Sequence, residues 1–491
     1  MANILSVAQS ALTAAQVGLT TTGHNIANAN TPGYSRQVVI QGTATSQDSG
    51  FGFVGKGTQV TGVKRVYDDY LASRVLTSQS SSNALDSYYS QIKQINNMFA
   101  DPTVGFSPAM KDFFAGVQSV AANPNSTAAR QTMLSSGEAL ASQLQSMDGQ
   151  LRGLGEGVTS QINTSIQTIN SYAQQIATLN DAIEKAQAGN DGKPANDLLD
   201  QRDQVVSDLS KEIKVSVVKQ NDSYSVFIGN GQPLVVSTKT FDLVPSASST
   251  DPSRAEVGYQ SNGKIITLAE NAITGGKLGG LFEFRAKTLD PAQNALGRIA
   301  IGLASTFNAQ HELGQDQNGA LGGAFFTAGT PLSKASSANT SDAQVAASIT
   351  DVNALTGSDY QLKWDGANYT VTRLSDNKSM YSAATFPATS IDGVAFSLQL
   401  QPPTNTPPSA GDLFLIRPTV NGAADFRVAI TDTKEIAAAA PIRTAATGTN
   451  TGSGIVSPGS VVNAAALTGH QYAINFSVAA GVTTYDVVDN T

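Results

Sequence analysis

Three aspartates near residue 200 come closest to the spacing of an acid–base site. Asp197, Asp200 and Asp203 recur at intervals of three within residues 196–203, with Arg202 among them. On a helix, such positions lie on roughly one side. A glycosidase instead needs two carboxyl groups that face each other across a cleft in unequal environments. The spacing therefore predicts a charged helical ridge with local ion pairs to Arg202, and no catalytic pair.

Two further motifs begin like ligand sites and then depart from them. The glycines of residues 50–55 satisfy G-x-G-x-x-G, but strand-like residues follow where a dinucleotide fold needs a helix. His311 and Glu312 begin like a zinc-protease motif, but Gln315 stands where the second histidine is required. Neither motif supports a cofactor or a metal ion.

A possible calcium loop fails in the same way. Residues 316–319 resemble the middle of an EF-hand loop, but Gly314 and Phe325 occupy its first and last ligand positions. The chain has no cysteine, so thiolate metal sites and cysteine nucleophiles are excluded. We therefore predict no catalytic residue, no bound cofactor and no metal.

Composition narrows the remaining classes of function. Only 14% of the 491 residues are charged, and the net charge is −8. A negative chain is poorly suited to neutralising phosphates, so a nucleic-acid partner is not predicted. No stretch approaches the ~20 apolar residues that a membrane helix needs, so membrane insertion is not predicted either.

The amino terminus has the most unusual pattern. The first charged residue is Arg36, and apolar residues recur at steps of three and four from Ile4 to Leu19. This periodicity predicts an uncharged amphipathic helix that packs on other protein. Gly23 and the Asn-rich run at 25–33 should end it, and alternating residues at 38–66 predict a β-ribbon.

Long helices are predicted to follow. Apolar residues at 71–99 fit a heptad seam, and a shorter amphipathic helix covers 106–120. Two apolar stripes continue at 133–154 and 158–183, and another helix is expected at 292–312.

Strand patterns dominate elsewhere. We expect an α+β multidomain protein with a long α-helical rod, a coiled-coil-like bundle, and inserted β-rich outer domains. The predicted boundaries are an amino-terminal polymerisation arm at 1–66, a helical rod domain at 67–212 completed by 276–340, a small β segment at 213–275, a β-rich outer domain at 341–440 and a partial β-rich domain at 441–491.

Four stretches together resemble one known family. The run His-Asn-Ile-Ala-Asn-Ala-Asn-Thr-Pro-Gly-Tyr at 24–34 is similar to the signature of the bacterial flagellar axial proteins of rod, hook and junction. Three further stretches make the likeness more specific: 196–203, 275–285 leading to 307–311, and 411–418. Together, the four stretches resemble the flagellar hook-associated protein 1 family. The likeness spans most of residues 1–440, and residues 441–491 are less distinctive.

The resemblance implies a structural protein of the bacterial flagellum and not an enzyme. Such a protein is exported unfolded through the flagellar type III channel, is secreted, and forms a ring of subunits at the hook–filament junction that adapts the hook to the filament. The implied partners are the flagellar hook protein, the second hook–filament junction protein, further copies of the chain and, in the full-length family, an export chaperone.

The residues expected to carry assembly and packing lie in the amino-terminal arm. They are Ile4, Leu5, Leu12, Leu19, Asn25, Ile26, Asn28, Asn30, Thr31, Pro32, Gly33 and Tyr34.

Members of this family end in a long helix that pairs with the amino-terminal one. The residues before Thr491 are β-like, so we expect this chain to be a truncated piece in which Leu5, Leu12 and Leu19 lack that partner. An isolated helix of this length is marginal in water. We therefore expect the first ~60 residues to be mobile in the free protein, with rapid amide exchange over residues 2–35.

Two other interpretations remain open at this point. A secreted β-rich adhesin, or surface binding module with a helical stalk, explains the acidic, cysteine-free composition but gives the uncharged first helix no use. A peptidoglycan-cleaving flagellar enzyme needs an acid pair or a metal cluster, which the sequence does not offer.

Overall fold

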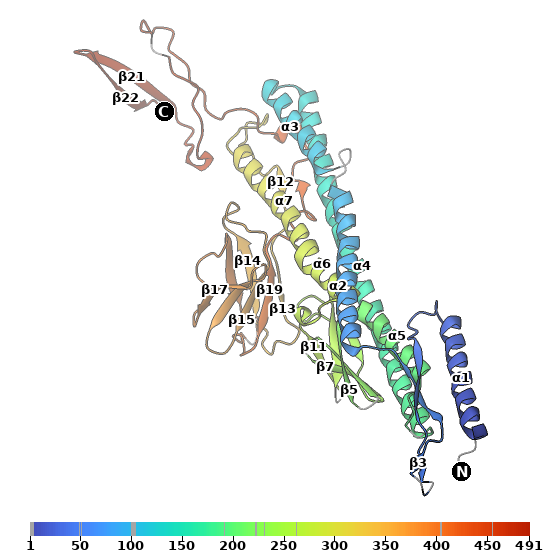
Figure 1. The fold of residues 1–491 in the computed structure, drawn as a ribbon. Coiled ribbons are helices and arrows are strands. Elements are labelled where there is room, and N and C mark those ends of the chain that lie inside the picture. The colour runs from blue at the N-terminus through green and yellow to red at the C-terminus, as the bar shows by residue number, and fades with distance from the viewer. Residues whose placement is uncertain are drawn as a thin grey trace. The chain divides into compact units, whose positions relative to one another are not determined.

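The computed structural model describes residues 4–48, 50, 52–99, 105–190, 192–220, 223–229, 231–261, 263–402, 405–453 and 455–491 (Figure 1). It divides into two compact units. The first comprises residues 1–96 and 153–290, and the second comprises residues 97–152 and 291–491. The combination of helices with several antiparallel sheets confirms the predicted α+β class.

The helices of the first unit are built from the periodic segments. They are α1 (Ile4–Ala27), most of α2 (Asp69–Phe99), the later part of α4 (Thr127–Ala188), α5 (Asn196–Glu212), η1 (Glu270–Ala272), α6 (Gly276–Phe284) and η2 (Arg285–Leu289). The α4 stripe forms the core: Val158, Ile162, Ile166, Ile169, Ala173, Ile176 and Ile183 are fully buried. The two stripes expected at 133–154 and 158–183 thus belong to one helix of 62 residues.

The first helix ends within the predicted Asn-rich run, but it passes through Gly23. Gly23 lies inside α1, which continues to Ala27. A single glycine costs a helix only ~1 kcal/mol, which the flanking turns can tolerate. The chain leaves the helix where the backbone N–H of Thr31 bonds the carbonyl of Asn28 at 2.9 Å, just before Pro32.

The second helix has the expected bounds, and most of its heptad seam faces outward. Leu71, Val75, Leu85 and Tyr89 of the predicted seam are exposed, whereas Ser80, Gln91 and Ile95 are buried. Small residues allow close packing here: a β-carbon at Gly280 of α6 would collide with the backbone of Ala84. The small, polar side of α2 therefore packs inward, and its apolar side faces outward.

Three antiparallel assemblies complete the first unit. The ribbon pairs β1 (Gln37–Thr43) with β4 (Thr58–Arg65), and β2 (Gln47–Asp48) pairs with β3 (Phe53–Val54). A four-stranded sheet has the order β5 (Val215–Gln220), β6 (Ser223–Ile228), β7 (Gln232–Val236), β8 (Lys239–Thr240). A three-stranded sheet has the order β11 (Lys264–Leu268), β10 (Ala255–Ser261), β9 (Leu243–Ala247).

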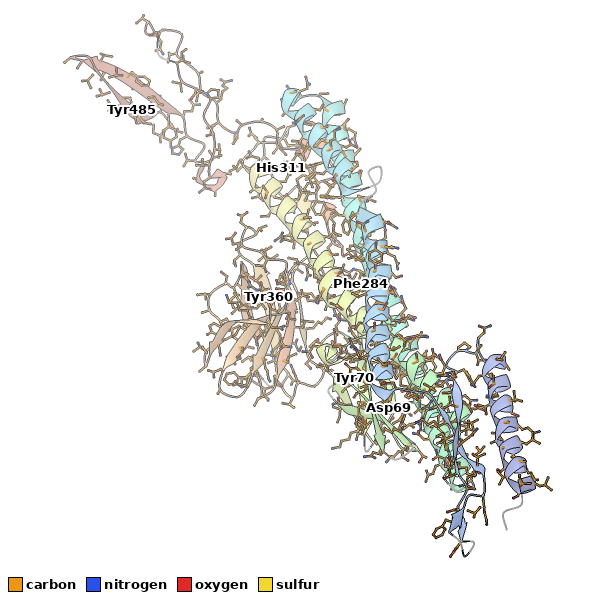
Figure 2. All side chains as sticks on the ribbon, in the orientation of Figure 1. Asp69, Tyr70, Phe284, His311, Tyr360 and Tyr485 are labelled. Atoms are coloured by element: carbon orange, nitrogen blue, oxygen red, sulfur yellow. The ribbon has the colours of Figure 1, made fainter. Side chains whose placement is uncertain are left out.

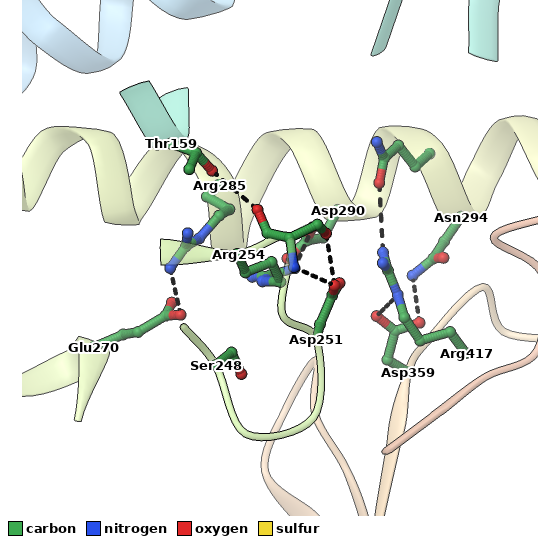
Figure 3. Close-up of polar contacts among 12 residues, drawn as sticks. Thr159, Ser248, Asp251, Arg254, Glu270, Arg285, Asp290, Asn294, Asp359 and Arg417 are labelled. Carbon is green, nitrogen blue, oxygen red and sulfur yellow. Dashed lines mark hydrogen bonds and ion pairs between the residues drawn. The ribbon is translucent and has the colours of Figure 1, made fainter. Parts of the chain in front are cut away.

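Ion pairs fix the three-stranded sheet to the helices of its unit (Figure 3). One guanidinium nitrogen of Arg254 lies 2.9 Å from both carboxylate oxygens of Asp290. Arg285 contacts Glu270 at 2.5 Å and donates to the carbonyl of Ala255 at 2.8 Å. Both arginines are largely shielded from water, so each pair also holds the sheet in one position.

The second unit has a helical and aromatic core. Its helices are α3 (Phe106–Ala122), the earlier part of α4, α7 (Asp290–His311) apart from its first residue, η3 (Thr433–Glu435) and η4 (Ala464–Ala466). Aromatic rings from distant segments meet edge to face or stacked: Phe113, Phe307, Phe325, Phe326 and Phe426. The short pair β12 (Phe326–Thr327) and β20 (Arg427–Val428) belongs to this cluster.

A β lobe is attached to α7 within the same unit. Its five-stranded sheet has the order β13 (Leu332–Ala335), β19 (Leu413–Arg417), β15 (Tyr360–Trp364), β16 (Tyr369–Arg373), β17 (Lys378–Ala383). A second layer pairs β14 (Gln344–Ile349) with β18 (Val394–Gln399). Asp359 accepts hydrogen bonds from Arg417 at 3.0 Å and from Asn294 of α7 at 2.9 Å (Figure 3). A separate hairpin pairs β21 (Tyr472–Ala479) with β22 (Val482–Asp489).

Candidate assembly surface

The outer side of α1 is apolar and exposed. Leu5, Leu12, Leu19 and Ile26 stand seven residues apart, and each side chain is between 70% and 75% exposed. A seven-residue spacing drifts only ~20° per step on a straight helix, so the four form one line along it. Ile4, at the start of α1, lies to one side of this line and is exposed as well.

The inner side of α1 rests on the ribbon. Ala14 is buried there, and the hydroxyl of Ser10 accepts a hydrogen bond from the backbone N–H of Thr58 at 3.2 Å. Gly57 has φ +92°, and a β-carbon at this position would collide with Ser10. The glycine therefore permits both the backbone conformation and the close approach of the helix.

Asn25 joins the end of α1 to the start of the ribbon. Its side-chain amide donates to the carbonyl of Gln37 and accepts from the N–H of Gln37, both at 2.8 Å. The Tyr34 hydroxyl donates to the Asn25 oxygen at 2.7 Å and lies 3.1 Å from Nδ1 of His24. Asn25 thus makes with Gln37 the two backbone hydrogen bonds that a neighbouring strand would make. These bonds fix the angle between helix and ribbon.

Other residues of the Asn-rich turn form hydrogen bonds within the turn. Asn28 donates to the carbonyl of His24 at 3.0 Å, and the Thr31 hydroxyl lies 3.2 Å from Oδ1 of Asn28. Gly33 has φ +79°, and a β-carbon there would press on Gln204 of α5. The two remaining predicted residues, Asn30 and Pro32, are exposed.

A hollow of about 790 Å³ lies between this turn and the α4–α5 pair. His24, Tyr34, Gln174, Asp197 and Gln204 are among its lining residues. Burial, together with the nearby carboxylates of Asp197 and Asp200, raises the pKa of the Tyr34 hydroxyl above its ordinary value. The hydroxyl therefore stays a neutral donor to Asn25.

The ribbon is anchored to α5 by a buried cation. Arg65 lies 2.9 Å from a carboxylate oxygen of Asp200 and 2.5 Å from one of Asp203, and all three side chains are at most 13% exposed. Burial acts to lower the pKa of Arg65, but the two carboxylates outweigh it and raise the pKa. The backbone N–H of Ser35 bonds Asp200 as well, at 2.9 Å.

A second arginine lies beneath this anchor. Arg202 is fully buried, with its guanidinium carbon 3.5 Å from the ring centre of Tyr224 and its Nη1 2.9 Å from Asn180. Burial raises the pKa of Tyr224 to about 12, and the charge of Asp203 acts in the same direction. Tyr67 lies under the Arg65 guanidinium, and burial raises the pKa of its hydroxyl also.

The predicted acidic ridge is therefore real, but its cation is a different residue. Asp200 and Asp203 pair with Arg65, about 135 positions away in the chain, and not as the predicted local pairs with Arg202. Asp197 accepts a hydrogen bond from Gln37 at 2.9 Å. The spacing of residues near 200 gave no sign of Arg65, although Arg65 is the last residue of β4, within the predicted ribbon.

The rejected motifs serve local structure. His311 is buried; its Nε2 accepts from the backbone N–H of Ala437 at 2.8 Å, and its Nδ1 lies 2.7 Å from the carbonyl of Gly323. Burial lowers the pKa of this imidazole, so the neutral ring is favoured. Asp316 caps its own loop through the N–H groups of Asn318 and Ala320. Within the described ranges, no three His, Asp or Glu side chains gather as a metal ion would require.

No helix in the described part of the chain combines the length and the apolar character needed to cross a membrane.

Three family models match the chain. Residues 92–326 match "Flagellar hook-associated protein FlgK helical domain", residues 334–418 match "Flagellar hook-associated protein 1, D2-like domain", and residues 5–34 match "Flagella basal body rod protein". The last range contains the exposed line on α1 and the Asn-rich turn.

Relatives of known identity agree with these models. Flagellar hook-associated protein 1 of Escherichia coli is 35% identical over 448 residues, which is 89% of this chain and 80% of that protein. The Salmonella typhimurium protein of the same name is 36% identical, over 89% of this chain and 79% of its own length. The solved structure of the flagellar hook junction protein FlgK from Burkholderia pseudomallei matches with a TM-score of 0.74 and 38% identity, covering 82% of this chain and 72% of that one. These likenesses favour the junction interpretation over the adhesin.

Proposed function

Because the chain belongs to the flagellar hook-associated protein 1 family, we propose that it is a structural subunit of the bacterial flagellum that forms the junction ring between hook and filament and allows the filament to assemble. Its work is to bind neighbouring protein through fixed surfaces, and no chemical step is part of this role.

The exposed apolar line on α1 is the observation that carries this proposal. Four large side chains on an uncharged helix face outward, although each would gain ~1.5–3 kcal/mol on burial. No charged group on α1 must lose water when the helix is covered. Such a surface suits permanent burial among other subunits better than it suits a free monomer.

The twelve predicted residues divide into two roles. We assign the contacts with neighbouring subunits to Ile4, Leu5, Leu12, Leu19 and Ile26. The other seven, Asn25, Asn28, Asn30, Thr31, Pro32, Gly33 and Tyr34, form the turn that sets the direction of α1. The bonds of Asn25 to Gln37 and Tyr34 support that positioning role.

The partners follow from the family. An axial protein assembles with other flagellar components, which for this chain are further copies of itself, the flagellar hook protein and the second hook–filament junction protein. The subunit is exported through the type III channel with the aid of a flagellar export chaperone, and it works outside the cell. We expect the β lobe and the separate hairpin to face outward from the flagellum.

The test uses a strain that lacks its own hook-associated protein 1 and is complemented with variants of this protein. Leu12→Asp with Leu19→Asp places two charges on the apolar line and should abolish filament attachment and swimming while the protein is still exported. The matched control, Thr13→Asp with Thr20→Asp, adds the same charge on the flank of the same helix, where both residues are exposed, and should swim.

Electron microscopy locates the protein independently. A tag inserted within residues 405–410 should label a band at the boundary of hook and filament. Swimming by the Leu12→Asp, Leu19→Asp strain, or a label elsewhere on the flagellum, would contradict the proposal.

A further inference from the structure

The chain contains an internal repeat. Ala354-Leu-Thr-Gly-Ser-Asp-Tyr-Gln-Leu-Lys-Trp364 is matched 112 positions later by Ala466-Leu-Thr-Gly-His-Gln-Tyr-Ala-Ile-Asn-Phe476. Five positions are identical, namely Ala, Leu, Thr, Gly and Tyr, and the Leu/Ile and Trp/Phe positions of the strands also align, without a gap. The first segment leads into and includes β15, and the second leads into β21 and includes its first five residues.

The two segments also share their local geometry. Gly357 and Gly469 both have positive φ, at +71° and +74°. The Thr356 hydroxyl lies 3.1 Å from the Tyr360 hydroxyl, and the equivalent atoms of Thr468 and Tyr472 lie 3.2 Å apart. In both segments a glycine with positive φ lies between a threonine and a tyrosine whose hydroxyl groups are in contact. The repeat is therefore a structural unit as well as a sequence pattern.

The second strand of each hairpin completes the match. Leu362 pairs with Val371 and Trp364 with Tyr369, whereas Ile474 pairs with Val487 and Phe476 with Tyr485. The aromatic pair is in ring contact in both hairpins, at 4.2 Å in the first and 6.1 Å in the second. Because alternate residues share one side of a strand, each hairpin has one apolar face made of equivalent residues.

The two faces differ in what covers them (Figure 2). In the first hairpin, Tyr360 and Leu362 are at most 1% exposed within the lobe core, whereas Tyr472 and Ile474 are 56% and 46% exposed. Tyr485 is 65% exposed, although its equivalent Tyr369 is buried. The second hairpin thus presents a core-type face to solvent.

The first hairpin shows which neighbour its inner strand accepts. On the side away from β16, β15 pairs antiparallel with β19, where Ile416 lies opposite Tyr360 and Phe414 opposite Leu362. Both β19 side chains are fully buried. Among the described residues, β22 is the only strand that pairs with β21, so the equivalent edge of β21 is open.

From this equivalence we propose that the open edge and apolar face of β21–β22 form a docking surface for an antiparallel β strand of the β19 type. The occupant carries two large apolar side chains at alternate positions, one opposite Tyr472 and one opposite Ile474. It adds backbone hydrogen bonds along β21 and extends the apolar face with its own two side chains, as β19 does beside β15 in the lobe.

The experiment supplies this strand in a defined form. The peptide Ala-Gly-Asp-Leu-Phe-Leu-Ile-Arg-Pro-Thr-Val, which is the sequence of residues 410–420, is fused after Thr491 through a 15-residue Gly/Ser linker. A tether of this kind raises the effective peptide concentration to the millimolar range. Amide exchange measured by mass spectrometry should slow at least tenfold over residues 472–479 and stay unchanged over residues 360–364.

Three controls make the result specific. Replacing the peptide residues that correspond to Phe414 and Ile416 by Asp, or changing Ile474→Asp in the hairpin, should abolish the protection. Asn475→Lys lies on the opposite face of β21, across from Asp486, and should retain it. Equal protection with the Asp-containing peptide, or none with the native peptide, would overturn the proposal. A dimer of the unfused chain, detected by light scattering and removed by Ile474→Asp, would identify a second copy as the occupant and would also overturn it.

Discussion

The helices α1 and α4 carry similar sequence patterns and have opposite surroundings. Each has an apolar stripe on a long segment that is poor in charge. In α4 the side chains of Ile162 and Ile166 are fully buried, whereas in α1 those of Leu12 and Leu19 are at least 70% exposed. Periodicity therefore predicts that a stripe will be buried, but not whether the same chain buries it.

The way the two helices are held explains the difference. The α4 stripe packs on apolar neighbours and forms the core of its unit. The amino-terminal arm, which comprises α1 and the ribbon, is held by polar contacts: Asn25 to Gln37, and Arg65 to Asp200 and Asp203. Polar anchoring fixes the arm without using its apolar line, which stays available for association between subunits.

The largest effect is expected from Ile166→Ala in α4. Removing a fully buried isoleucine leaves a cavity and costs about 2–5 kcal/mol of the free energy of unfolding. Calorimetry should show a melting transition lowered by several degrees. Thr164→Ala, at an exposed position of the same helix, should leave that transition unchanged. An equal shift for both variants would mean that the α4 stripe is not the core.

A smaller, local effect is expected from Arg65→Met. Removing one partner of a buried ion pair costs about 3–5 kcal/mol when the other charge stays buried. Here the ribbon can separate from α5 and let water reach Asp200 and Asp203, so the arm should loosen while the α4 core persists. Amide exchange at 37–43 and 58–65 should accelerate at least tenfold, with little change at 158–183.

The control for this anchor removes all of its charges together. Adding Asp200→Asn and Asp203→Asn to Arg65→Met leaves no unpaired buried charge and should restore part of the protection. Unchanged exchange in Arg65→Met would show that the ion pairs do not hold the arm. The wild-type protein in the same measurement tests the expected rapid exchange over residues 2–35.

Patterns within one segment were sufficient to predict the elements. The bounds of α2 at 69–99 follow from its seam, and the buried α4 stripe follows from its spacing. The ribbon at 38–66 was predicted from alternation and glycines. Each of these signals depends on neighbours within a few positions, which the sequence displays directly.

Contacts between distant segments could not be predicted in the same way. The pairing of Arg65 with Asp200 depends on how the ribbon meets α5, and no local spacing encodes that geometry. The heptad seam of α2 was predicted, but not which side of the helix this chain buries: close contact with Gly280 brings the small side of α2 inward. The repeat at 354–364 and 466–476 was visible in the sequence and needed only a comparison of the chain with itself.

The smallest effect on folding is expected from Leu12→Ser, and this variant separates the two helices most directly. Leu12 is 70% exposed, so shortening it removes little contact within the monomer. Substitutions at such positions usually change the free energy of unfolding by less than about 0.5 kcal/mol. Urea denaturation should therefore give the wild-type midpoint, whereas Ile166→Ala should lower it. If Leu12→Ser destabilised the purified chain as much as Ile166→Ala, the line on α1 would be part of the folded core, and its assignment to contacts between subunits would be wrong.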